Sequence, residues 1–269
     1  MGIPSDTVDK LQQTFAAIST LGAALSEAQW KTPTDLPGWT VQDNLSHVIG
    51  TERMLQGLPR TDHVATPNAH VKNPIGEMNE NEVDARRAKP GEEVLAEWNE
   101  LAELRVSTLR NADDAYFDAP AMTPTGPATV ADFLHIRVLD CWAHEQDMRR
   151  ALDLPGSLDT PSAEHTIDRL TRTLPIVIGK RAATAEGDAV TIWLTGPVHR
   201  TLTYEVVGGR ATQVDQPTKP AVATVQMDSE AFATLALGRR AAATFGDRIN
   251  INGDTELGQK VVDQLNMMI

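Results

Sequence analysis

Residues 35–52 read DLPGWTVQDNLSHVIGTE and define the start of a helix. A Pro-Gly-Trp turn leads to Thr40, and Thr40-Val-Gln-Asp43 has the Ser/Thr-x-x-Asp/Glu pattern of a capping box, in which two side chains satisfy free amides at a helix start. Apolar residues then recur at helical spacing, at Leu45, Val48, Ile49 and Leu55, with Glu52 on the same stripe. His47 falls off that stripe early in the helix. A histidine in this position is a candidate for chemistry inside a helical fold.

A second capped helix is predicted about 90 residues later in the chain. Thr129 to Asp132 repeats the Thr-x-x-Asp start, and the helix is expected to run to about Leu152. Within it, RVLDCWAHEQDMRRAL (137–152) places Asp140 and His144 four residues apart, so their side chains are neighbours on one face. A separate apolar stripe comprises Leu134, Val138, Cys141, Met148 and Leu152. The helix therefore combines a face for packing with a face that carries a carboxylate and an imidazole.

These residue types at this spacing point to a metal site. A carboxylate and a histidine at i and i+4 can bind one divalent ion, and a neighbouring helix of a bundle can supply a third ligand. His47 is the natural candidate for that ligand. Two histidines and one carboxylate leave coordination positions open, which distinguishes catalytic metal sites from structural ones. The simpler interpretation, a solvated Asp-His pair on a helix surface, is also compatible with the spacing alone.

Composition narrows the class of protein. The 269 residues carry a formal charge of −13, with no concentrated run of Lys or Arg, so we expect no nucleic-acid partner. No apolar run approaches the roughly 20 residues needed to span a bilayer, and the N-terminus lacks the apolar core of a signal peptide. Cys141 is the single cysteine, which excludes an intrachain disulfide and favours a cytoplasmic location. Any thiol chemistry must use a sulfur that a partner brings.

The first half of the chain is predicted to be helical. Apolar residues from Val8 to Leu25 and from Val94 to Leu109 recur at helical spacing, in addition to the two capped helices. A loop is expected from Leu58 to about Glu77, a short helix over Glu77–Ala88, and a further loop over MTPTGPATVADF (122–133). Four long helices with short or irregular connections predict a bundle.

After Thr160 the pattern changes to mixed strands and helices. A helix is expected from about Ser162 to Lys180, with a kink or break at Pro175. Strand-like runs follow, AVTIWLT (189–195), TLTYEVV (201–207), VATVQMD (222–228) and DRININ (247–252), with Gly208-Gly209 suited to a hairpin. Two more helices are expected, Ser229–Leu237 and Asp254–Met267. The sequence thus predicts a helical domain over 1–155 and a small α+β domain over 156–269.

Taken together, DLPGWTVQDNLSHVIGTE and RVLDCWAHEQDMRRAL resemble the mycothiol-dependent maleylpyruvate isomerase family. The second half matches that family's C-terminal domain in MDSEAFATLALGRR (227–240) and INGDTELGQKVVDQLN (251–266). The resemblance implies a DinB-like four-helix bundle that holds a divalent metal, usually zinc, followed by a domain similar to sterol carrier proteins. It covers nearly the whole chain in the expected order, and the two N-terminal motifs are the more specific part.

The resemblance also implies roles for particular residues. Its metal triad corresponds to His47, Asp140 and His144, with Asp140 where the isomerase has Glu. The chain looks still more like the mycothiol S-transferase branch, which conjugates this actinobacterial thiol to electrophiles in detoxification. Mycothiol is then the cosubstrate, zinc the expected metal, and the metal-activated thiolate of mycothiol the nucleophile, since no protein side chain is suited to that role. Asp147 and Arg239 are candidates for contacts with the thiol.

Several alternatives remain at the level of sequence. The same metal site suits a mycothiol-dependent isomerase of maleylpyruvate-like acids. A second alternative is a non-enzymatic protein that binds a lipid or small ligand and carries a structural metal. A third is a non-haem iron oxygenase, which also uses two histidines and a carboxylate, although the strand pattern of that class is absent. The electrophile and the oligomeric state are not determined by the sequence.

Overall fold

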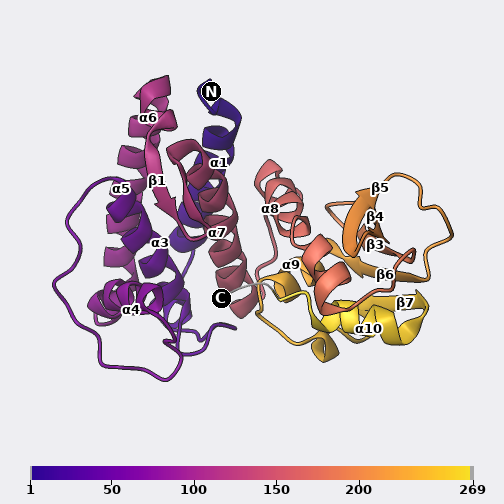
Figure 1. Cartoon of the computed structure of the whole chain (residues 1–269). Helices are drawn as coiled ribbons and strands as arrows, with labels where there is room; N and C mark the ends of the chain where they lie inside the picture. The colour runs from indigo at the N-terminus through magenta and orange to yellow at the C-terminus, as the bar shows by residue number, and fades with distance from the viewer. Residues whose placement is uncertain (1, 267–269) are drawn as a thin grey trace. The chain divides into compact units, whose positions relative to one another are not determined.

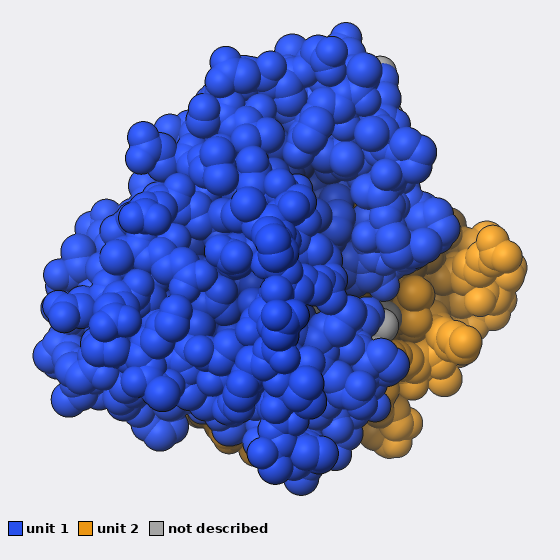
Figure 2. Space-filling view, turned by 90° about the vertical axis from the view of Figure 1, so that its left-hand side faces the viewer, with its two compact units in different colours: residues 1–157 blue, residues 158–269 orange. Residues whose placement is uncertain are grey.

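The computed structural model of the chain describes residues 2–266. The chain divides after Ser157 into two units, residues 1–157 and 158–269, which Figure 2 shows in separate colours. In the described part, no helix combines the length and the apolar character that crossing a membrane requires. Each unit has its own set of buried apolar side chains.

Four long helices form the first unit, as the apolar spacing predicts (Figure 1). They are α1 (Ser5–Ala23), α3 (Val41–Leu55), α5 (Gly91–Asn111) and α7 (Val130–Ala151). Helices α1 and α3 each contact both α5 and α7, so the apolar stripes of all four helices meet in one core. The largest fully buried apolar side chains in this core include Phe15, Leu45, Trp98 and Leu134. The predicted helical bundle is confirmed.

Shorter elements connect these helices, and several of them differ from the sequence prediction. They are α2 (Glu27–Trp30), α4 (Pro74–Arg87), α6 (Asp114–Asp118), β1 (Pro120–Thr123) and β2 (Gly126–Thr129). Helix α4 begins before Glu77, because the Asn73 side chain accepts a hydrogen bond from the Gly76 amide and Pro74 occupies the first turn. The loop predicted over 122–133 was wrong: β1 and β2 form a hairpin there, and α7 follows directly. Such short strands contain too few residues to show a period of two.

Both predicted capping boxes are formed. The Thr40 amide donates to Asp43 Oδ2 at 2.8 Å and Thr40 Oγ1 accepts from the Asp43 amide at 3.3 Å. The Thr129 amide and Asp132 Oδ2 lie 3.1 Å apart in the equivalent pair of α7. These caps fix the first residue of α3 and of α7, and packing against the other helices decides which face of each points into the bundle. Since α3 and α7 are in contact, the candidate ligands on both helices have a defined register.

The second unit is a five-stranded sheet with helices, in the order β5-β4-β3-β6-β7. Its strands are β3 (Ala189–Thr195), β4 (Arg200–Val207), β5 (Arg210–Val214), β6 (Ala223–Asp228) and β7 (Ile249–Gly253). Strands β3 and β6 pair in parallel and the other pairs are antiparallel. The helices are α8 (Pro161–Thr171), α9 (Ser229–Ala236) and α10 (Thr255–Asp263), with a π-helical turn η1 (Ile176–Arg181) and two 3₁₀ turns, η2 (Ala242–Thr244) and η3 (Gly246–Arg248). This arrangement confirms the predicted α+β class.

The details that sequence reasoning missed here have local causes. Helix α8 ends at Thr171, and a separate π-helical turn follows Pro175, so the continuous helix predicted to Lys180 was wrong. Strand β5 was missed because RATQV is short and polar, although Gly208-Gly209 forms the predicted connection to it from β4. Helix α10 ends at Asp263, and Met267, the predicted end, lies outside the described residues.

Removing the cap of α7 tests how much this helix start contributes. We expect Thr129→Ala to lower the free energy of unfolding of the first unit by about 1 kcal/mol, because the Asp132 amide loses its acceptor. Urea denaturation followed by circular dichroism measures the change. Thr20→Ala on the exposed side of α1 is the control and should change stability by less than half as much.

Candidate metal centre

The three residues predicted as ligands lie together in the first unit. His47 comes from α3, and Asp140 and His144 come from α7; one possible ligand atom from each lies within 4.8 Å of the others. His47 Nε2 is 3.5 Å from Asp140 Oδ2, and His144 Nε2 is 3.7 Å from Asp140 Oδ1. The two imidazole rings are 4.7 Å apart between centroids. Tertiary structure therefore brings one face of each capped helix to a common point.

The donor atoms and their spacing suit a divalent cation. Ligand bonds of about 2.0–2.2 Å put two ligand atoms of one tetrahedral ion roughly 3.3–3.5 Å apart, and the distances between Asp140 and each imidazole are close to this. They are long for direct hydrogen bonds. His47 Nδ1 is also buried, with no hydrogen-bond partner among the described residues. The distances around Asp140 are therefore those expected between ligands of one cation, while His47 Nδ1, on the other side of the ring from Nε2, has no partner among the described residues.

The local charges favour the ligating forms of these side chains. Burial opposes ionisation of Asp140, but Arg137 and the two imidazoles outweigh it and hold the carboxyl pKa well below its usual 3.8. Burial lowers the pKa of His47, and the attraction of Asp140 opposes this only in part. Asp140 is therefore a carboxylate and His47 a neutral imidazole near neutral pH. These are the protonation states that bind metals.

A buried ion network fixes Asp140. Arg137 Nη1 donates to Asp140 Oδ2 at 2.6 Å, and Arg137 Nε donates to Glu52 Oε1 at 2.7 Å. The other Glu52 oxygen accepts from Arg105 Nε at 2.9 Å. Glu52, Arg105 and Arg137 are at most 2% exposed, so these charges interact in a poorly screened environment. The network joins α3, α5 and α7 and ends at the candidate metal ligand.

His144 is oriented by two polar groups behind it. Its Nδ1 lies 2.8 Å from Asn44 Oδ1 and 3.4 Å from Asp147 Oδ2. An acceptor at Nδ1 places the proton there and leaves Nε2 free as a ligand, a common arrangement around metal-binding histidines. Asp147 is fully buried and also pairs with Arg150. Asp147 is therefore placed to orient the ring of His144. The expected contact between Asp147 and mycothiol stays a prediction.

Cys141 does not have the properties of a nucleophile. Its side chain is fully buried, and Arg137 Nη2 donates to the sulfur at 3.2 Å. Burial raises the pKa of the thiol well above its usual 9.0, even with Arg137 nearby. The thiolate is therefore disfavoured, as expected for a small core residue.

An aromatic side chain flanks the cluster. The Trp39 ring is 5.4 Å from the His47 ring and 6.0 Å from the His144 ring, tilted by 40° and 36°. Its Nε1 donates to Glu80 Oε2 on α4 at 3.0 Å. The cluster thus has ligands on two helices and an indole beside both imidazoles.

Sequence reasoning did not assign Trp39, Asn44, Glu52 or Arg137 to the site. Asn44 and Arg137 each lie three residues before a predicted ligand, so a search of the ligands' own helix faces would have found them. Nothing local marks Trp39 or the pairing of Glu52. Arg239, the second candidate for thiol contact, lies in the second unit, where its Nη1 donates to the Leu237 carbonyl at 2.9 Å; its proposed role stays a prediction.

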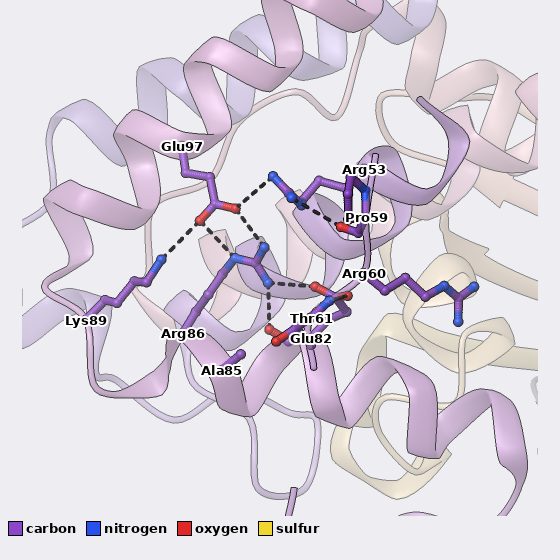
Figure 3. A pocket seen from close by; sticks show the side chains of 9 residues that line it. All are labelled: Arg53, Pro59, Arg60, Thr61, Glu82, Ala85, Arg86, Lys89 and Glu97. Atoms are coloured by element: carbon purple, nitrogen blue, oxygen red, sulfur yellow. Dashed lines mark hydrogen bonds and ion pairs between the residues drawn. The ribbon is translucent and has the colours of Figure 1, made fainter. Parts of the chain in front are cut away.

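A separate polar pocket lies between α3, α4 and α5 (Figure 3). Glu97 accepts from Arg86 at 2.7 and 3.0 Å and from Lys89 at 3.4 Å, while Arg86 also donates to Glu82 at 3.0 Å. These charges largely neutralise one another. None of the candidate ligands lines this pocket. We interpret its charged side chains as an ion-pair network that holds α4 against the bundle.

Known proteins resemble this chain in fold and in sequence. Crystal structures of the mycothiol-dependent maleylpyruvate isomerase and of a histidine-to-alanine mutant of that enzyme superpose with TM-scores of 0.57 and 0.56, at 16% and 13% identity, over 92% of each chain. Two uncharacterized proteins from strains of Mycobacterium tuberculosis are 24% identical over 212 residues, which cover 73% of this chain and 79% of theirs. At such identity the crystal structures establish the fold alone.

The fold and the cluster define a two-domain protein with a candidate metal centre in its helical bundle. Residues 11–149 match the family described as the mycothiol maleylpyruvate isomerase N-terminal domain, and residues 178–266 match the SCP-2 sterol transfer family. The first match spans just over half of the chain. The chain therefore belongs to the mycothiol maleylpyruvate isomerase family.

The buried carboxylate of the network provides a test of stability. We expect Glu52→Gln to lower the free energy of unfolding by about 3–5 kcal/mol, because Arg105 and Arg137 lose their shared charge partner. Burial opposes the ionisation of Glu52, but the two arginines lower its pKa below 4.5. The stabilisation is then fully present above pH 4.5 and lost as the pH falls through the lowered pKa.

Urea titrations between pH 7 and pH 3 measure this difference. The gap between wild type and Glu52→Gln should stay constant down to about pH 5 and shrink below pH 4.5. Glu103→Gln, on an exposed position of α5, is the matched control. A gap that closes between pH 7 and pH 5 would contradict a lowered pKa.

Proposed function

We propose that this protein is a metal-dependent enzyme that uses mycothiol as cosubstrate and transfers the thiol to an electrophilic carbon of a small molecule, in detoxification. One observation carries the proposal: two imidazoles and a carboxylate converge beside a core whose single cysteine is buried and protonated. The protein therefore offers ligands without a nucleophile of its own. A thiol from outside supplies what is missing, and family membership names mycothiol as that thiol.

Each residue of the site has a physical role in this proposal. His47, Asp140 and His144 would hold the divalent ion, with zinc the preferred metal for this set of ligands. When bound, such an ion lowers the pKa of a thiol and so supplies the thiolate form near neutral pH. Arg137 fixes the Asp140 carboxylate, and Asn44 with Asp147 fixes the ring of His144. Trp39 places an indole beside both imidazoles.

The reaction is a nucleophilic addition or substitution. The thiolate sulfur forms a bond to the electrophilic carbon; a leaving group departs with its electron pair, or an epoxide oxygen or a conjugated double bond takes up the electrons and a proton. The protein positions the reactants, and its buried side chains keep the charges of the site fixed.

A second candidate is isomerisation of a maleylpyruvate-like acid. The description of the matching family and the names of two structural neighbours favour it. Both candidates begin with attack of the thiol on an electrophilic carbon, but the isomerase expels the thiol again. Product mass separates them: a transferase gives a thioether and consumes mycothiol, whereas an isomerase gives a product of unchanged mass and consumes none.

A binding function without catalysis is the third candidate, because residues 178–266 match a sterol transfer family. A lipid retained by the freshly purified protein in native mass spectrometry, together with no thiol-dependent activity, would favour this function over both enzymes.

Loss of one ligand tests the proposed metal centre. We expect His144→Ala to lose bound metal and to reduce thiol conjugation at least about a hundredfold, because even outer-shell changes cost ten- to a hundredfold. Elemental analysis and conjugation assays with mycothiol measure the two effects, and circular dichroism checks the fold. His199→Ala, an exposed histidine of the second unit, should retain metal and activity. Full conjugation by a metal-free His144→Ala sample would end the proposal.

A further inference from the structure

Trp39 is held beside the candidate metal centre by three segments that are distant in sequence. Its backbone lies in a tight turn, in which the Trp39 amide donates to the Leu36 carbonyl and the Thr34 amide donates to the Trp39 carbonyl, at 3.1 and 2.9 Å. Its indole N–H donates to Glu80 of α4 at 3.0 Å. His70, from the loop before α4, lies 3.2 Å from the same Glu80 oxygen. The ring is therefore fixed at both ends.

Close packing around the turn supports the same conclusion. Gly38 has φ of +77°, and a Cβ atom there would lie 2.7 Å from the ring of His70. Only glycine therefore fits both the backbone conformation and the approach of this histidine. Arg87 pairs with the second Glu80 oxygen at 2.7 Å and with the capping residue Asp43 at 3.3 Å. These contacts link the orientation of Trp39 to the start of the helix that carries His47.

The exposure of the cluster indicates where a small molecule can approach. The side chains of His47 and His144 are 9% and 8% exposed, whereas that of Asp140 is 24% exposed. Trp39 is itself partly exposed, and its ring lies within about 6 Å of both imidazoles. A small molecule bound at this cluster would therefore lie close to a fixed indole.

We propose that Trp39 is a specificity-determining residue, which favours electrophiles whose reacting carbon belongs to a flat conjugated system over saturated alkylating agents. This inference rests on the proposed function. The electron-rich face of an indole attracts flat, electron-poor π systems, and a rigid ring loses little entropy on contact. A saturated carbon presents neither a flat surface nor a π system. The flat shape and the electron-rich face of the Trp39 indole thus select the class of substrate.

The test compares two electrophiles with mycothiol and the metal-loaded enzyme. N-ethylmaleimide is the conjugated acceptor: sulfur bonds to an alkene carbon and a proton adds to its neighbour. Iodoacetamide is the saturated one: sulfur displaces iodide. In Trp39→Leu we expect the ratio of kcat/KM for the two to fall roughly three- to tenfold, the size of one aromatic stacking contact. In Trp39→Phe, which keeps a smaller aromatic ring, the same ratio should fall less.

A second variant leaves the indole in the chain. Glu80→Leu removes the acceptor that fixes the ring, so the ratio should fall in the same direction, and this variant carries the test if Trp39→Leu does not fold. Trp193→Phe, an exposed tryptophan of β3, is the matched control and should leave the ratio unchanged. An unchanged ratio in the folded Trp39 and Glu80 variants, with both rates reduced alike, would overturn the specificity role.

A readout without catalysis separates this inference from the proposed function. One equivalent of Co²⁺ should quench part of the tryptophan emission of the metal-free protein; the quenching should decrease in Trp39→Phe, because the Trp39 ring is about 6 Å or less from both imidazoles, and persist unchanged in Trp193→Phe. Absence of quenching in the wild type would overturn both the proposed metal centre and the proposed role of Trp39 beside it. A wild type that is quenched but does not accelerate conjugation would refute the proposed function and with it this inference. An active wild type with an unchanged ratio in the variants refutes the inference alone.

Discussion

The structure of the first unit depends on one buried carboxylate, Glu52, which is shared between Arg105 and Arg137. Burying three charges is costly unless each is paired and hydrogen-bonded, and here the geometry meets that condition. The arrangement fixes three helices of the bundle relative to one another. It also determines the site, because the guanidinium of Arg137 extends from Glu52 to Asp140.

The contact of Arg137 with both Glu52 and Asp140 links the buried ion network to the protonation state of a candidate metal ligand. Burial opposes the ionisation of Asp140, but Arg137 and the two imidazoles hold its pKa well below 3.8, and the hydrogen bond from Arg137 fixes the orientation of the carboxylate. The imidazoles are held by other contacts: Asn44 and Asp147 lie at His144 Nδ1, and the ring of His47 packs beside those of Trp39 and His144. The cluster is therefore preorganised by the surrounding protein.

The fold was predictable where local patterns are long or specific. Both capping boxes, the long helices and the strand at residues 189–195 agree with the structure, because periodicity and caps depend on neighbouring residues alone. The hairpin of β1 and β2, strand β5 and the end of α8 were mispredicted, because short elements carry little periodic signal and are decided by their partners. The ligand pair Asp140 and His144 could be recognised from its spacing on one helix.

By itself the sequence determined the class of each half, the starts of the two central helices and the residue types available as ligands. Only the tertiary structure brought His47 of α3 next to the pair on α7, placed Trp39 beside the imidazoles and enclosed Glu52 between two arginines. The physical reason is the sequence separation over which each kind of interaction acts. Hydrogen bonds of caps and helical periodicity act over a few residues, whereas the ion pairs of Glu52 and the contact between His144 and Asn44 join residues 53 to 100 positions apart and exist only once the helices have packed.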